Sequence, residues 1–146
     1  MSRWDNRFMR LAREVSSWSK DPSTKVGAVL VRDRRIVATG YNGFPRGMVD
    51  DDRLQVRDIK YKRVIHAEMN AVLFAGPDGA RGATVYIYGM RGPCNNCSKH
   101  LIQAGIRRVV CCGPEPRPDW SVELEDSKFM LAECMVEYHE IEEEDL

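Results

Sequence analysis

Two cysteines three positions apart, Cys94 and Cys97, give this sequence its most specific chemical signal. They lie in the stretch "GPCNNCSKH", with a proline before the first and a polar pair between them. Such a pair is compatible with a redox couple, half of a four-cysteine zinc site, a disulfide, or ordinary packing at a helix start. The other residues of the chain are needed to distinguish these four interpretations of the cysteine pair.

The remaining cysteines argue against a disulfide framework and against a four-thiolate site. Cys111, Cys112 and Cys134 bring the total to five, an odd number, and the first residues lack the apolar core of a secretory signal. No second C-x-x-C occurs in the sequence, and no thioredoxin-like strand–helix–strand unit precedes the pair. Cys111 and Cys112 lie in an apolar run typical of a buried strand, and we expect Cys134 to be buried in the same way.

A histidine and a glutamate from another segment supply the groups that the cysteine pair lacks for a catalytic zinc site. His66 and Glu68 open a predicted helix as "HAE", and Cys94 and Cys97 open another, where backbone N–H groups favour thiolates. Zinc held by one imidazole and two thiolates keeps a fourth position for a water, whose pKa falls to about 7. Glu68, left unligated, would then carry protons between that water and a substrate.

The rest of the chain predicts alternating strands and helices after a leading hairpin. Helices are predicted at 4–18, from about 66 to 75, at 95–105 and at 121–135; strands are predicted at 26–31, 35–41, 83–89, 106–112 and 136–141. This order predicts one α/β domain over residues 1–146, with a mixed, roughly five-stranded sheet. The polar segment 42–63 is longer than an ordinary loop of about 12–15 residues, so we expect it to be partly ordered or functional.

Composition excludes several classes of protein. With 43% hydrophobic and 30% charged residues, the chain has the composition of a folded domain, and no apolar run approaches the about 20 residues of a membrane span. The formal net charge of zero argues against sequence-independent nucleic-acid binding. Residues 1–63 carry 15 Lys and Arg against 8 Asp and Glu, which indicates either a solvated face or a site for a small phosphorylated ligand. We expect a cytoplasmic protein (host cytoplasm if viral) without membrane or nucleic-acid partners.

Four blocks of sequence together resemble the deoxycytidylate (dCMP) deaminase family of the cytidine deaminase superfamily. "HAEMNA" and "PCNNC" carry the H-x-E…P-C-x-x-C pattern of zinc nucleobase deaminases. "SKDPSTKVGAVLV", "GYNGFPRG" and "CSKHLIQAGIRRVV", which continues the "PCNNC" block, are also similar to that family, so the resemblance covers roughly residues 4–112. It implies a three-layer α/β/α sandwich and the zinc-dependent hydrolysis of dCMP to dUMP and ammonia.

The resemblance also implies roles for individual residues. The zinc ligands would be His66, Cys94 and Cys97, and the proton shuttle would be Glu68. The substrate residues would be Asn42 at the sugar, Ser19 and Lys20 near the monophosphate with Lys20 or Arg46 as its cation, and the Ala67 N–H at the pyrimidine edge. Members of the family are typically homohexamers activated by dCTP and inhibited by dTTP, which makes Tyr41, Asn42, Gly43 and Arg46 the candidate effector residues.

Two departures from the family pattern sharpen these expectations. The family usually has an aromatic residue after the "VVCC" strand to stack on the base, whereas here Trp120 is the one aromatic side chain of that loop. Some relatives carry a second zinc before "HAE", but residues 48–65 contain neither Cys nor His, so we expect one zinc per chain. Alternatives remain: a deaminase of cytidine or of tRNA adenosine, or a nucleotide-binding module in which zinc only joins two helices.

Overall fold

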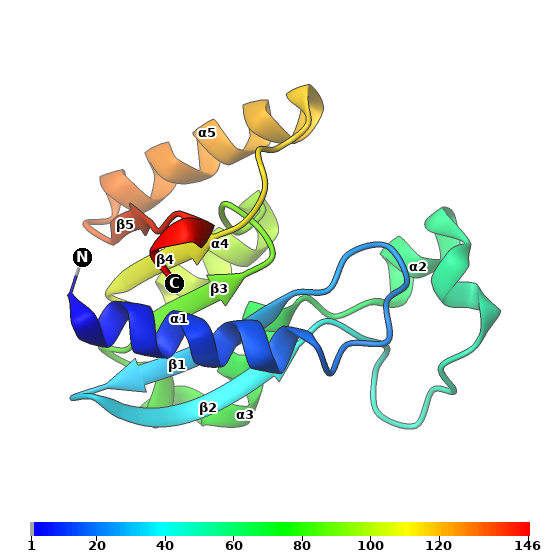
Figure 1. The fold of residues 1–146 in the computed structure, drawn as a ribbon, viewed down its shortest axis with the longest axis horizontal. Helices are drawn as coiled ribbons and strands as arrows, with labels where there is room; N and C mark the ends of the chain where they lie inside the picture. Colours follow the sequence, from blue (N-terminus) through cyan, green and yellow to red (C-terminus); the bar gives the residue numbers. More distant parts are fainter. Residues whose placement is uncertain (1) are drawn as a thin grey trace.

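A five-stranded mixed sheet forms the middle layer of the computed structural model, which describes residues 2–146 (Figure 1). Its order is β2-β1-β3-β4-β5, with β1 antiparallel to both of its neighbours and β3, β4 and β5 parallel. The strands are β1 (Gly27–Arg32), β2 (Arg35–Tyr41), β3 (Thr84–Tyr88), β4 (Arg108–Cys112) and β5 (Glu137–Glu140). The predicted mixed sheet of about five strands is confirmed.

Helices cover both faces of this sheet. Helix α1 (Arg3–Ser16) lies on the face that is nearer in Figure 1, and α3 (Ala67–Ala80) and α4 (Asn95–Gln103) lie behind the sheet. Successive strand residues divide between two cores: Val29, Tyr86 and Val110 pack with α1, whereas Leu30 and Val85 belong to the core on the other side. This alternation follows from the two-residue period of a strand. The three-layer α/β/α sandwich is confirmed.

Several boundaries differ from the sequence prediction. Helix α5 (Pro118–Glu133) begins three residues earlier than expected, because Pro118 takes the first helical turn, where its missing N–H costs nothing. Helix α3 continues past Gly76, whose φ of 73° breaks the helix into two pieces. The polar segment 42–63 contains η1 (Asp52–Gln55) and α2 (Arg57–Arg63), so the expected partial order is confirmed.

The predicted burial of the three cysteines outside the C-x-x-C pair is confirmed for two of them. Cys111 and Cys112 are buried in β4 on opposite faces of the sheet, whereas Cys134 is exposed. The prediction for Cys134 was wrong because α5 ends at Glu133, so that Cys134 follows the last buried turn of the helix. A short η2 (Glu143–Asp145) ends the described chain, and no helix within residues 2–146 is both long and apolar enough to cross a membrane.

A glycine in β2 sets how closely α3 approaches the sheet. A Cβ atom at Gly40 would lie 2.4 Å from the backbone oxygen of Ala67 and 2.5 Å from the backbone nitrogen of Ala71. Since real Cβ atoms do not make such contacts, only glycine lets the first turn of α3 rest on the edge strand. That first turn carries Glu68 and follows directly after His66.

Candidate active site

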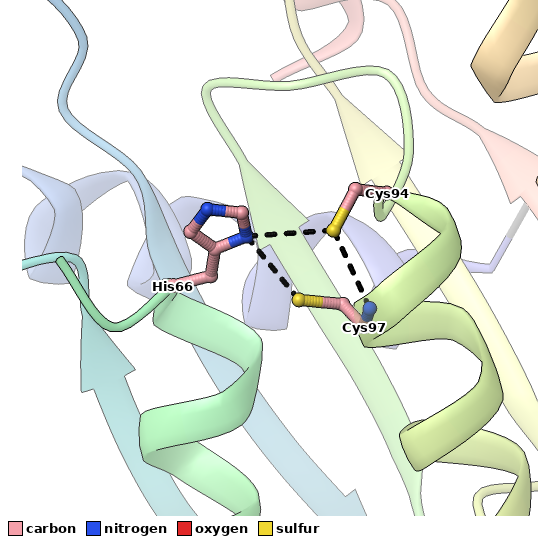
Figure 2. A group of neighbouring side chains, drawn as sticks. All are labelled: His66, Cys94 and Cys97. Carbon is pink, nitrogen blue, oxygen red and sulfur yellow. Dashed lines mark hydrogen bonds between the residues drawn. The ribbon is translucent and has the colours of Figure 1, made fainter. Parts of the chain in front are cut away.

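Two helix starts bring His66, Cys94 and Cys97 together (Figure 2). His66 precedes the first residue of α3, Cys94 precedes the first residue of α4, and Cys97 lies in the first turn of α4. The Nδ1 atom of His66 lies 3.2 Å from Cys97 Sγ and 3.6 Å from Cys94 Sγ. Two ligands of one tetrahedral zinc ion stand about 3.6 Å apart when Zn–N is about 2.1 Å and Zn–S about 2.3 Å. The three side chains therefore fit a shared ion without rearrangement of the backbone.

Glu68 lies beside this cluster without a hydrogen bond. The residue is 1% exposed, and neither carboxylate oxygen has a hydrogen-bond partner among the described residues. Its closest charged neighbour is His66, with Oε1 3.6 Å from Nδ1, which is too long for a hydrogen bond. A buried carboxylate without partners is costly to a fold and calls for an explanation. A cation with bound water, or a polar substrate, would satisfy this side chain.

The groups of the cluster shift one another's pKa values. The hydrogen bond with Cys94 and the negative charge of the nearby Glu68 carboxylate outweigh burial and raise the pKa of His66 to about 10. The hydrogen bond with Cys97, aided by His66 and opposed by burial, lowers the pKa of Cys94 to about 4. The same bond to Cys94, together with burial, raises the pKa of Cys97. Burial alone would raise the pKa of Glu68, but the neighbouring imidazole outweighs it and lowers the pKa. Binding of a divalent ion to such a donor set displaces protons, so its affinity depends on pH.

Helix α5 fixes the start of α4, next to Cys94. The backbone N–H of Asn95 donates to Glu123 Oε1 at 3.1 Å, and Ser127 Oγ donates to Asn95 Oδ1 at 2.7 Å. A carboxylate at a helix N-terminus satisfies a free N–H group and complements the helix dipole. Glu123 therefore orients the turn that presents both thiols.

An arginine ties the loop before Cys94 to the end of the chain. Arg91 lies 3.0 Å from a carboxylate oxygen of Glu140, 3.0 Å from one of Glu142 and 3.3 Å from one of Glu115. Tyr138 also donates a hydrogen bond to the backbone oxygen of Arg91. Sequence reasoning missed Arg91 and Glu123, and no local signal marks them, because their partners are 24 to 51 residues away.

Four of the residues expected to meet a nucleotide line one cavity of about 100 Å³. Its walls come from Lys20, Asp21, Tyr41, Asn42, Gly43, Phe44, Asp50 and Leu54. Gly43 pairs as an isolated β-bridge with Ile65, the residue directly before His66. This bridge links the cavity wall to the segment that carries His66, although none of the cluster residues lines the cavity; its use by a nucleotide stays a prediction.

Asn42 and Ser19 are already engaged within the protein. Asn42 Oδ1 accepts from the Val26 N–H at 2.9 Å, and its Nδ2 donates to the Thr24 oxygen at 2.8 Å. Ser19 is buried, and its Oγ donates to the Asn42 backbone oxygen at 2.8 Å. These bonds shape the segment from Ser19 to Val26; the expected contacts with a sugar and a phosphate stay predictions.

Three other residues expected to bind substrate or effector, Lys20, Arg46 and Ala67, differ in exposure and in their contacts. Lys20 is exposed and pairs with Asp50 at 3.2 Å. Arg46 is exposed and lies outside the residues that line the cavity. Ala67 is buried in the first position of α3, between His66 and Glu68.

Trp120 is half-buried in the first turn of α5. It stands one turn before Glu123, whose carboxylate contacts the start of α4. The indole is therefore carried by the same helix that positions the residue after Cys94; its expected stacking on the base stays a prediction.

Comparisons with known proteins agree with this geometry. The family model of the cytidine and deoxycytidylate deaminase zinc-binding region matches residues 2–113. An uncharacterized deaminase of Aliivibrio fischeri is 42% identical over 141 residues, which cover 94% of this chain and 92% of that protein. Human deoxycytidylate deaminase is 40% identical over 114 residues, which cover 73% of this chain and 63% of the human protein.

Solved structures give the same result. The crystal structure of dCMP deaminase from the cyanophage S-TIM5, in complex with dCMP and dUMP, matches with a TM-score of 0.78 and 26% identity. The match covers 97% of this chain and 99% of that one. The matched family region contains Glu68 and the whole cluster of His66, Cys94 and Cys97. The chain therefore belongs to the cytidine and deoxycytidylate deaminase zinc-binding family.

Proposed function

We propose that this protein is a zinc-dependent deaminase that hydrolyses dCMP to dUMP and ammonia. The observation that carries the proposal is the buried, unpartnered carboxylate of Glu68 beside His66, Cys94 and Cys97. A site that used zinc only to join two helices would need no such carboxylate. The human and cyanophage relatives, named as deaminases of this nucleotide, support dCMP as the substrate.

His66 Nδ1 and the two Sγ atoms would hold one zinc ion per chain. Bound zinc lowers the pKa of a coordinated water to about 7, which supplies a nucleophile at neutral pH. Three protein ligands leave a position for that water, and the described residues offer no fourth Cys or His ligand to the cluster.

Glu68 would move two protons during the reaction. It takes a proton from the water that attacks C4 of cytosine and delivers it to the ring nitrogen N3. The second proton goes from the attacking oxygen through Glu68 to the departing amine, so that water and dCMP give dUMP and ammonia. Burial of Glu68 keeps bulk water away from this exchange and leaves its oxygens available to both partners.

The cavity lined by Lys20 and Asn42 would bind the nucleotide. Lys20 is the cation we place at the monophosphate, because it lines the cavity and a guanidinium or ammonium group there matches a phosphate. Ser19 and Asn42 would shape the sugar and phosphate end, the Ala67 N–H would meet the pyrimidine edge, and Trp120 would stack on the base. We further propose that the chain works as a cytoplasmic homohexamer, in which dCTP activates and dTTP inhibits through Tyr41, Asn42, Gly43 and Arg46.

A side-by-side substrate panel tests the reaction. We expect ammonia release from dCMP to exceed that from CMP, cytidine and a tRNA anticodon stem containing adenosine at the wobble position. Equal or faster turnover of cytidine would contradict the nucleotide assignment. Ammonia release from the tRNA alone would show that the substrate is adenosine in tRNA and not a free nucleotide.

Metal analysis tests the cofactor with a matched pair of thiol variants. Cys97→Ser should lose most of the zinc and part of its thermal stability, because ligation and folding are coupled at such a site. Cys111→Ser is the control, since Cys111 is buried in β4 and is not part of the cluster. Full zinc content in Cys97→Ser would contradict the ligand set.

A further inference from the structure

A groove of about 520 Å³ lies at the opposite end of the sheet from the cysteine–histidine cluster. The cluster follows the carboxyl end of β3, whereas the groove is formed where β3 and β4 begin, beside Thr84 and Arg108. Since a five-residue strand is about 16 Å long, the two places are separate. The groove is lined by Ser2, Trp4, Asp5, Phe8, Val31, Arg32, Asp33, Arg34, Gly82, Thr84, Tyr86, Arg107 and Arg108.

Positive charge dominates this lining. It contains four arginines and two aspartates, in a protein whose formal net charge is zero. One aspartate is committed within the floor: Asp5 Oδ1 accepts from Arg108 Nη1 at 2.6 Å and from the Tyr86 hydroxyl at 2.8 Å. Arg32 is also committed, because it donates to three backbone oxygens at the end of α3. The floor is therefore a fixed polar network.

The two remaining arginines present guanidinium groups to the groove. Arg34 and Arg107 are exposed, and neither has a carboxylate partner within residues 2–146. Arg34 lies over the indole of Trp4, 5.0 Å from the ring centroid, and Trp4 stacks on Phe8 with centroids 5.8 Å apart. The groove is thus lined by two guanidinium groups without a carboxylate partner, by the exposed Asp33 and by an aromatic wall.

Such a combination suits a particular class of ligand. A guanidinium group can bind a phosphate through two parallel N–H···O bonds. The volume lies within the about 300–1,000 Å³ of small-molecule sites, so it holds more than a phosphate ion alone. We propose that this groove binds an organic phosphate, with the phosphate group on Arg34 and Arg107 and the carbon skeleton against Trp4 and Phe8.

Titration calorimetry with the zinc-loaded protein tests the site, with phenyl phosphate and inorganic phosphate as probes. We expect one phenyl phosphate per groove and clearly weaker binding of inorganic phosphate, which has no group for the aromatic wall. The double variant Arg34→Gln/Arg107→Gln should weaken phenyl phosphate binding by at least about tenfold. Both side chains are exposed, so the variant should keep its melting temperature.

Two controls separate the groove from other anion sites. Arg57→Gln/Arg63→Gln removes the same two charges from the exposed surface of α2 and should change the affinity less than about twofold. Lys20→Met alters the cavity that Lys20 lines and should also leave the affinity for phenyl phosphate unchanged. The proposal is wrong if both double variants weaken binding equally, if Lys20→Met abolishes binding, or if the two probes bind alike. Absence of any binding heat at millimolar probe would also overturn it.

Discussion

Two buried carboxylates at opposite ends of the sheet differ in their hydrogen bonding. Asp5, in the first turn of α1, is 4% exposed and accepts hydrogen bonds from the Ser2 N–H and Oγ, the Tyr86 hydroxyl and Arg108. Glu68, in the first turn of α3, is 1% exposed and has no hydrogen-bond partner among the described residues. Both lie in the first turn of a helix, so the helix end alone does not explain the contrast.

The difference lies in what surrounds each carboxylate. Asp5 is saturated by the protein, so its charge contributes to folding and leaves little for a ligand. Glu68 is buried without a hydrogen-bond partner, which is the pattern expected where a protein keeps a group available for chemistry. The comparison predicts that stability should respond to Asp5 and catalysis to Glu68.

The largest expected effect is the loss of turnover in Glu68→Gln. The amide cannot take up the proton of the attacking water, so kcat for dCMP should fall by about 10²–10⁴-fold. Zinc content and the free energy of unfolding should stay within experimental error, because Glu68 holds no partner in the fold. Ammonia release, metal analysis and urea unfolding measure the three quantities. Activity near that of the unaltered protein would remove Glu68 from the mechanism.

The next effect is the loss of stability in Asp5→Asn, which leaves Arg108 without its main partner. Removing one member of a buried ion pair typically costs about 3–5 kcal/mol. We expect the lower end, about 3 kcal/mol, because the Arg108 side chain is 19% exposed and Glu137 lies 3.7 Å from it. Urea unfolding gives the number, and kcat at 25 °C should be unchanged. A fall in kcat without a loss of stability would reverse the comparison.

A smaller effect should appear when the pH is lowered. Burial alone would raise the pKa of Asp5, but the hydrogen bonds from Arg108, Ser2 and Tyr86 outweigh it and hold the pKa well below its usual range. The stabilisation by Asp5 is therefore complete above the unfolded-state pKa of about 3.9 and is lost as the pH falls below it. The stability difference between the unaltered protein and Asp5→Asn should shrink between about pH 4 and pH 2. A difference that is constant over this range would exclude the ionised carboxylate as its source.

The smallest effect concerns a carboxylate that is paired at the surface. Asp50 meets Lys20 at 3.2 Å, with side-chain exposures of 35% and 71%. Exposed pairs of this kind contribute about 0–1 kcal/mol, so Asp50→Asn should change the free energy of unfolding by less than about 0.5 kcal/mol. Thermal unfolding at low and high salt measures it. A larger loss would show that the exposure of a carboxylate is the wrong criterion for ranking its contribution to stability.

The sequence predicted the cluster well because its information is local. The H-x-E and P-C-x-x-C motifs each place their side chains at a helix start, and helix periodicity and the strand pattern then fix where those starts lie. His66 and Cys94 therefore met as expected once the sheet order was right. The burial of Cys111 and Cys112 followed from the same strand pattern.

What the sequence could not give depends on contacts between distant segments. Glu123 contacts Asn95 and Arg91 contacts Glu140 because α5 and β5 pack beside α4, and neither pair has a sequence spacing that indicates contact. Asn42 was interpreted as a sugar ligand, whereas the fold first uses its amide to hold Val26 and Thr24. Such competing uses of one side chain become visible only in three dimensions.

Gly40 has a consequence for anyone who mutates or recodes this protein. Any side chain there would push the first turn of α3 away from β2, and His66 and Glu68 would move with it. In a saturation library selected for deaminase activity, the codon at position 40 should tolerate no replacement, although it lies 26 residues before the histidine motif. A mutational scan restricted to the metal-binding motifs would overlook it.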